Sequence, residues 1–172
     1  GDNFKSKGLV FFKNKVKTTK FYYTQKELLK LKSIQKIILQ KNLINLARET
    51  LNAEPIISNI VCWHSFPSKK PDEQAAQMWH FDMERPKWIK FFIYLSDCNS
   101  LNGPHSFIIG SHKNDGIPKD LRMHGYKRLD DEIKNRNFPK KNLIDIKCEK
   151  GSLLIEDTRG LHKGKMLQKG KR

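Results

Sequence analysis

After Pro55 the hydrophobic residues change from a helical spacing to an alternating one. Short runs of β-branched and aromatic residues follow, and segments rich in Pro, Gly and Asn separate them, which is the pattern of strands joined by turns. Several short strands after a helical N-terminal part favour a curled antiparallel sheet, or jelly roll. The residue ranges predicted as strands are 56–63, 76–82, 88–95, 106–109, 143–148 and 152–157.

The residues before Pro55 have the period of helices. Thr24 and Glu27 can form a capping box, in which the Thr side chain caps the amide of Glu27 and the Glu side chain reaches back. Apolar residues then recur at spacings of three and four as far as Leu51. The polar residues at 40–42 are expected to divide this segment into two helices.

A chain of 172 residues is normally one domain with a core of its own. We therefore expect a single domain over residues 1–172, with a helical part at about 24–52 and a jelly-roll part at about 56–172. The predicted fold class is mostly β with N-terminal helices. Residues 112–141 are polar, basic and without clear periodicity, so we predict a long loop there.

The chain is basic, with a formal net charge of +16. Only 7 of its 34 Lys and Arg residues are Arg, and the lysines are scattered along the whole sequence. Nucleic-acid-binding faces usually gather Arg and stacking aromatic residues on one surface. A nucleic-acid partner is therefore disfavoured, and a basic nucleic-acid-binding domain is kept as an alternative.

The cysteines and the hydropathy pattern bear on the compartment. Cys62, Cys98 and Cys148 are widely spaced and include no Cys-x-x-Cys pair, which fits a reducing environment. No apolar run approaches the length of a membrane span, so no membrane partner is expected. The predicted location is the cytoplasm. The sequence does not indicate an oligomeric state.

His80 and Asp82 are two residues apart in a segment predicted to be a strand. Residues with this spacing point to the same face, so an imidazole and a carboxylate can meet at one point. With a second imidazole they make the 2-His-1-carboxylate set, which leaves open positions on Fe(II). A His-x-Asp pair alone is common by chance, and the alternative interpretation is a surface histidine beside a solvated aspartate.

His162 can supply the second imidazole, because a turn at 158–161 returns the chain toward the sheet. Arg172 follows later, and its planar guanidinium can pair with a carboxylate through two hydrogen bonds. It is a candidate partner for the far end of a dicarboxylate. The alternatives are a loop histidine with a structural hydrogen bond and a solvated arginine.

Taken together, these residues resemble the phytanoyl-CoA dioxygenase family of Fe(II)/2-oxoglutarate-dependent oxygenases, over roughly residues 25–172. Four ordered blocks with suitable gaps are far more specific than one His-x-Asp pair. The blocks, with the end of the chain, are Gln77–Asp82, Lys90–Leu95, Asn102–His112, Gly151–His162 and Gly170–Arg172. The resemblance implies a double-stranded β-helix, a cupin-like jelly roll, preceded by helices.

The resemblance also implies a dioxygenase that uses Fe(II), 2-oxoglutarate and O₂, hydroxylates a small organic substrate, and releases succinate and CO₂. It implies His80, Asp82 and His162 as the catalytic metal ligands. Arg172 is implied as the partner of the distal carboxylate of 2-oxoglutarate. Tyr94 lies near a position that lines the co-substrate pocket in relatives, and on a strand Lys90 shares its face, so either could contact 2-oxoglutarate.

Other residues near these motifs are given supporting roles. Asp157 and Arg159 are expected to orient the second histidine, and Ser111 is expected to be structural. Gly164 stands where some relatives carry a hydroxyl group that assists the co-substrate carboxylate. The family normally continues beyond the position of Arg172, so the chain is expected to be truncated at its C-terminal end.

Three interpretations compete with the small-molecule oxygenase. The first is a nucleic-acid demethylase of the same superfamily, which is disfavoured because the segment 163–171 contains no Arg. The second is a jelly roll that binds a metal without catalysis or as a hydrolase with Zn²⁺ at a similar triad, and the third is the basic nucleic-acid-binding domain. The lysines in the predicted loops favour an anionic substrate, but the sequence does not identify the substrate.

Overall fold

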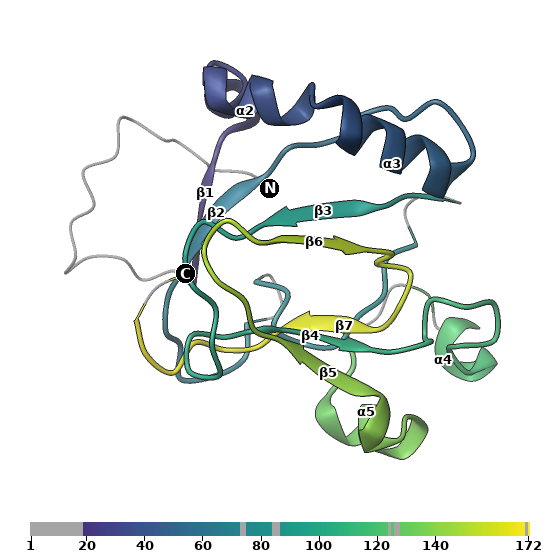
Figure 1. Ribbon diagram of the computed structural model, residues 1–172. Coiled ribbons are helices and arrows are strands. Elements are labelled where there is room, and N and C mark those ends of the chain that lie inside the picture. The colour runs from purple at the N-terminus through teal and green to yellow at the C-terminus, as the bar shows by residue number, and fades with distance from the viewer. Residues whose placement is uncertain (1–18, 73–74, 84–86, 124, 126–127, 171) are drawn as a thin grey trace. The chain divides into compact units, whose positions relative to one another are not determined.

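The structure is a computed structural model, drawn in Figure 1. It describes residues 19–72, 75–83, 87–123, 125, 128–170 and 172. The chain divides into two compact units, residues 1–65 and 66–172. In the part that the structure describes, no helix has both the length and the apolar character needed to cross a membrane. The expectation of a single domain over 1–172 stays a prediction.

The first unit begins its helical part where the sequence predicts. The Thr24 hydroxyl accepts from the amide of Glu27 at 3.3 Å, and the Glu27 carboxylate accepts from the amide of Thr24 at 3.1 Å. These reciprocal bonds satisfy amides that have no partner inside the helix. The capping box is therefore confirmed. It opens the short helix α1, Gln25–Leu28.

Three helices, not two, follow one another in this unit. After α1 come α2, Lys32–Ile38, and α3, Lys41–Leu51. The predicted break at 40–42 is present as the start of α3, and a second break lies at 29–31, which the periodicity does not reveal. The left-handed residue Asn52, with φ of 49°, ends α3.

The predicted strand at 56–63 is wrong for most of its length. The observed strand β2 is Cys62–Ser65, and it pairs antiparallel with β1, Lys20–Tyr23. Residues 56–61 form no strand, and Ile56 is 89% exposed. β-branched residues favour a strand only where a partner and a buried face are available, and β1 offers just four residues for pairing.

The described strands of the second unit form two antiparallel sheets. Four of them begin within two residues of predicted strands, and the fifth, β7, was not predicted. β3 pairs with β6, and β4 lies between β5 and β7 (Figure 1). The predicted antiparallel architecture is confirmed, and the described strands do not close into a barrel. The bounds are Lys90–Ile93 for β3, His105–Ile108 for β4, Leu143–Ile146 for β5, Leu153–Glu156 for β6 and His162–Gly164 for β7.

The two faces of β4 differ in chemistry. Ser106 and Ile108 are both fully buried, and Ile108 belongs to the hydrophobic core. His105 and Phe107 alternate with them, so they point to the opposite face, which is shared with their cross-strand partners on β7. The core on the first face contains Trp79, Phe81, Ile108, Ile117, Leu121, Leu129, Phe138 and Leu161.

The prediction of a long loop at 112–141 is wrong. The segment contains α4, Lys119–Met123, then α5, Asp131–Asn137, and a 3₁₀ turn begins at Lys140. The Asp130 carboxylate caps α5 by accepting from the amide of Ile133 at 2.8 Å. Helices this short show too few turns for a clear period, and they are stabilised by apolar residues of the core that lie in or beside them.

Gly103, in the turn before β4, offers a test of how tightly the second unit packs. Its φ is +74°, and a Cβ there would lie 2.4 Å from the carbonyl oxygen of Lys165. Gly151 has a similar φ of +90° but nothing within 4 Å of such a Cβ. A left-handed backbone costs an L-residue about 1–2 kcal/mol. We expect Gly151→Ala to lower the free energy of unfolding by about that amount, and Gly103→Ala to lower it by clearly more.

Urea unfolding of the two variants measures the difference. Equal losses of stability in both variants would show that the chain relaxes around position 103 without cost.

Candidate metal centre

Three residues from two distant segments of the sequence meet in the second unit. His80, Asp82 and His162 each offer one ligand atom, and these atoms all lie within 4.8 Å of one another. The three residues are only 4–5% exposed. Two imidazoles and one carboxylate, buried together, form a donor set that can hold a metal ion.

Backbone hydrogen bonds place these side chains. The amide of His80 donates to the carbonyl of His162 at 3.0 Å, and the amide of His162 donates back at 2.8 Å. The amide of Asp82 donates to the carbonyl of Thr158 at 2.9 Å. The predicted strand at 76–82 is wrong as a continuous element, because only isolated bridges form at Trp79 and His80. These bridges are sufficient to bring the two histidines side by side.

Hydrogen bonds to backbone carbonyls orient both imidazoles. His80 Nδ1 lies 2.9 Å from the carbonyl oxygen of Met78, and His162 Nδ1 lies 2.8 Å from that of Gly160. A carbonyl only accepts, so each Nδ1 carries the proton and the lone pair lies on each Nε2. Metal-binding histidines in proteins are held in this way.

Burial also keeps the two imidazoles neutral. It lowers the pKa of His80 to about 3, with a further contribution from the nearby His162, and it lowers the pKa of His162 as well. Burial alone would raise the pKa of Asp82. The hydrogen bond from Lys90 and the charges around it outweigh that effect, and the pKa of Asp82 is lowered. At neutral pH the site therefore presents two neutral imidazoles and one carboxylate.

Lys90 contacts the metal-ligand set directly. Its Nζ lies 2.5 Å from Oδ2 of Asp82, across the end of β3. Asp82 also forms a hydrogen bond with the side chain of Thr158, which in turn accepts from Trp88 at 2.7 Å. Lys90 thus holds the carboxylate in place. Its predicted contact with 2-oxoglutarate stays a prediction.

Arg172 lies close to Gly164 and acts electrostatically on Tyr94. The Arg172 Nη2 would be 3.8 Å from a Cβ at Gly164, two residues after His162, and its Nη1 donates to Cys98 Sγ at 3.9 Å. Burial raises the pKa of Tyr94, and electrostatic interaction with Cys98 raises it further, whereas the charge of Arg172 lowers it. Among the described residues, no carboxylate forms an ion pair with Arg172.

The turn before His162 is fixed by residues that the sequence marked as supporting. The Ser111 hydroxyl donates to the carbonyl of Ile108 and accepts from the amide of Leu161 at 2.7 Å, so its expected structural role agrees with these contacts. Arg159 and Asp157 pair with each other at 2.5 Å. Their expected role in orienting His162 stays a prediction.

Two residues that the sequence did not indicate as site residues lie beside the donor set. His105 Nε2 lies 2.7 Å from Glu156 Oε2, and Glu156 Oε1 lies 3.9 Å from His162 Nδ1. The only signal in the sequence is a glutamate at the end of an otherwise apolar strand, which the alternation of β6 points inward.

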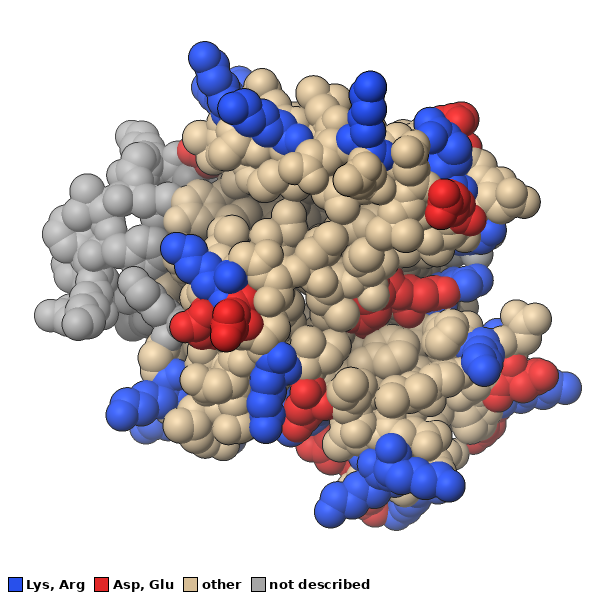
Figure 2. Space-filling view, viewed as in Figure 1, with Lys and Arg blue, Asp and Glu red and all other residues tan. Residues whose placement is uncertain are grey.

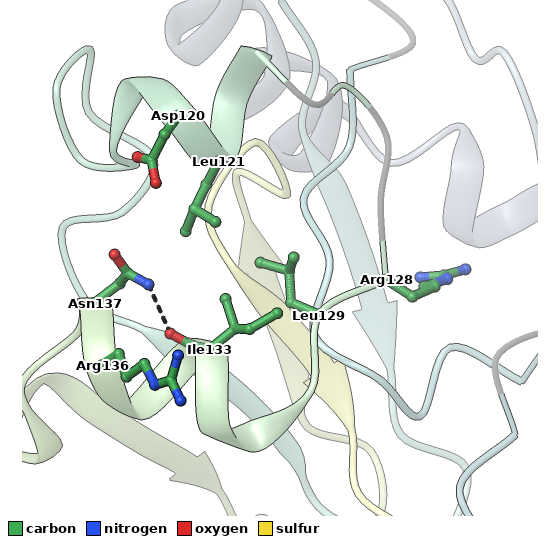
Figure 3. A pocket seen from close by; sticks show the side chains of 7 residues that line it. All are labelled: Asp120, Leu121, Arg128, Leu129, Ile133, Arg136 and Asn137. Carbon is green, nitrogen blue, oxygen red and sulfur yellow. Dashed lines mark hydrogen bonds between the residues drawn. The ribbon is translucent and has the colours of Figure 1, made fainter.

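A pocket in the second unit lies apart from this donor set (Figure 3). Arg128 differs from the other lining residues because its side chain points away from them. None of the three candidate ligands lines the pocket, so it is not the metal centre. The lining residues are Asp120, Leu121, Arg128, Leu129, Ile133, Arg136 and Asn137.

The cationic side chains on the face shown in Figure 2 stand singly or in small groups, often beside acidic ones. They do not merge into one continuous stripe on this face. This distribution agrees with the scattered lysines of the sequence. The expectation that nucleic acid is not a partner stays a prediction.

Comparisons with known proteins identify the family to which this chain belongs. No curated protein matched the chain. The crystal structure of AviO1 from Streptomyces viridochromogenes Tue57 is similar, with a TM-score of 0.47 and 14% sequence identity over 88% of this chain and 61% of that chain. This chain thus spans less than two thirds of AviO1. The family model of phytanoyl-CoA dioxygenase (PhyH) matches residues 7–166. Because that match covers most of the sequence, the chain belongs to the phytanoyl-CoA dioxygenase (PhyH) family.

Proposed function

We propose that this chain is an Fe(II)/2-oxoglutarate-dependent dioxygenase in which His80, Asp82 and His162 hold the iron. Its family supports an oxygenase-type enzyme. The observation that carries the assignment of ligands is the buried donor set, in which one ligand atom from each of the three residues lies within 4.8 Å of the others. The residues fit Fe(II), because two imidazoles and one carboxylate leave positions for a chelating co-substrate and O₂.

The family implies a double-stranded β-helix, and we propose that the two antiparallel sheets of the second unit are its two halves. In that arrangement β3 contributes Lys90 and Phe92 to the interior, and Tyr94, directly after the strand, continues the same alternation.

The iron would supply the activation of O₂, coupled to oxidative decarboxylation of 2-oxoglutarate to succinate and CO₂ and to hydroxylation of the substrate. The protein residues bind and orient. Arg172 would pair with the distal carboxylate of 2-oxoglutarate through its planar fork. Tyr94 would line the same pocket. Lys90 would keep Asp82 in one orientation through its contact with Oδ2.

The substrate in this proposal is a small organic molecule with an anionic group. Arg128 supports that choice. The backbone of the next residue, Leu129, pairs with Trp79, and Trp79 immediately precedes His80. The Arg128 side chain points away from the other residues of the pocket drawn in Figure 3, and its charge contributes to the lowered pKa of His80. A guanidinium at that place would attract an anion toward the metal centre.

The first prediction concerns the iron. We expect the wild-type protein to bind Fe(II) and to form succinate from 2-oxoglutarate under O₂, and His162→Ala to lose both, because two ligands hold the metal far less tightly than three. His112→Ala is the matched control, since His112 is exposed and lies outside the donor set. Metal binding is measured by anaerobic titration and succinate by chromatography.

A jelly roll that binds a metal without this chemistry, or a zinc hydrolase, would give metal binding without succinate. That outcome would contradict the proposed function.

The second prediction concerns the co-substrate. Arg172→Gln removes the bidentate pairing with the distal carboxylate, so we expect the Kd for 2-oxoglutarate to rise by about 10-fold to 100-fold, equivalent to about 1.4–2.8 kcal/mol. The affinity for Fe(II) should stay unchanged. Arg136→Gln is the control, because Arg136 pairs with Glu132 on α5. An unchanged Kd for 2-oxoglutarate in Arg172→Gln would exclude this role.

The third prediction concerns pH. Because burial lowers the pKa of both imidazoles, protons should not compete with the metal near pH 6.5, the ordinary pKa of histidine. We expect the affinity for Co(II), used as a stable probe, to change little between pH 7.5 and about pH 6. A fall in affinity centred near pH 6.5 would mean that the imidazoles of the metal-free protein are exposed to water.

A further inference from the structure

Glu156 is a buried carboxylate without an aligned hydrogen bond. Its side chain is 5% exposed, at the inward-facing end of β6. Neither of its oxygens has a hydrogen-bond partner among the described residues. The Nε2 of His105 approaches Oε2 to 2.7 Å but is not aligned for a hydrogen bond, and it too lacks a partner. Unsatisfied buried polar groups are rare and costly, so this carboxylate requires an explanation.

The position of Glu156 connects it to a candidate metal ligand. Its Oε1 lies 3.9 Å from Nδ1 of His162, on the edge of the ring opposite the metal-binding nitrogen. The ring of His105 stacks on the ring of His162, with centroids 5.5 Å apart and an angle of 26° between the planes. The ring of His80 lies against the same imidazole at 4.2 Å. His162 is thus enclosed by His80, His105 and the Glu156 carboxylate.

A divalent cation changes the balance of charge at this position. When it binds Nε2 it draws electron density from the imidazole, and the Nδ1–H edge becomes more positive. A carboxylate 3.9 Å from that edge stabilises this added positive charge. In the low-dielectric interior this attraction offsets part of the cost of burying Glu156. The carboxylate is therefore better accommodated with a metal bound than without one.

We propose that Glu156, braced by His105, is a positioning residue that strengthens metal binding through His162. This inference rests on the proposed function, since it assumes that the three ligands hold Fe(II). It adds a carboxylate outside the ligand set to the charges that determine the affinity for a divalent ion.

The test compares Glu156→Gln, which keeps the shape and removes the charge, with Glu156→Asp, which keeps the charge. Co(II) is the probe, and its visible absorption reports both the affinity and the ligand geometry without any turnover. We expect the Kd for Co(II) to rise by about 10-fold or more in Glu156→Gln, in line with other partners of metal-bound histidines. The increase in Tm on adding Co(II) should shrink in parallel. Glu156→Asp should retain more of the affinity.

Asp145→Asn is the matched control. Asp145 lies on β5, where it pairs with Lys165 and accepts from Ser106. Asp145→Asn also removes one negative charge from the same unit. The partners of Asp145 are Lys165 and Ser106 rather than His162, so the electrostatic environment of His162 should change far less. The Kd of this variant for Co(II) should equal that of the wild type. An effect of Asp145→Asn as large as that of Glu156→Gln would reduce the result to net charge and overturn the inference.

Two failures can be told apart. If the wild-type protein binds neither Fe(II) nor Co(II), the proposed function fails. If it binds them normally and Glu156→Gln binds Co(II) with the same Kd and the same spectrum, the metal centre stands and the role of Glu156 is wrong. Circular dichroism of each variant confirms that it is folded. If Glu156→Gln is misfolded, Glu156→Ala, which also removes the charge, becomes the deciding variant. An affinity reduced no more than in Asp145→Asn would then also overturn the inference.

Discussion

The reciprocal pair of backbone hydrogen bonds between His80 and His162 is the interaction on which the candidate site depends. The two residues are far apart in sequence, so bringing them together costs loop-closure entropy that the sheet must offset. Once their backbones pair, their side chains emerge from neighbouring positions on the same face. The bond from Asp82 to Thr158 extends this contact and adds the carboxylate. These two neighbouring backbone contacts therefore place all three donors.

Burial of these donors would be unfavourable if their other polar atoms were left unsatisfied. The carbonyls of Met78 and Gly160 accept from the two Nδ1 atoms, and Lys90 and Thr158 occupy the carboxylate of Asp82. What remains are two Nε2 lone pairs and part of one carboxylate, all facing one point. The network that makes burial tolerable is thus also the network that leaves a ligand set for a metal.

The sequence predicted the parts of this arrangement that depend on local spacing. The interval between His80 and Asp82, the capping box at Thr24 and the alternation in β3 are all properties of a few consecutive residues. The helices within 112–141 were not predicted, because elements of five and seven residues are stabilised by packing against the core rather than by a period of their own. The Lys90–Asp82 contact and the Glu156–His105 pair join segments that are separate in the sequence, and the second pair joins the two sheets, so both become visible only in the folded chain.

The charges around the site give a reason for the kind of ligand it would hold. Among the described residues, the cations Lys90, Arg128 and Arg172 surround a centre whose carboxylates are Asp82 and Glu156. A divalent metal and a dianionic co-substrate would arrive together without changing that balance. The three cations would then still outnumber the two carboxylates by one charge. A substrate that brings an anionic group would offset this excess, whereas a cationic one would add to it. The electrostatics that would bind 2-oxoglutarate would thus also favour an anionic substrate.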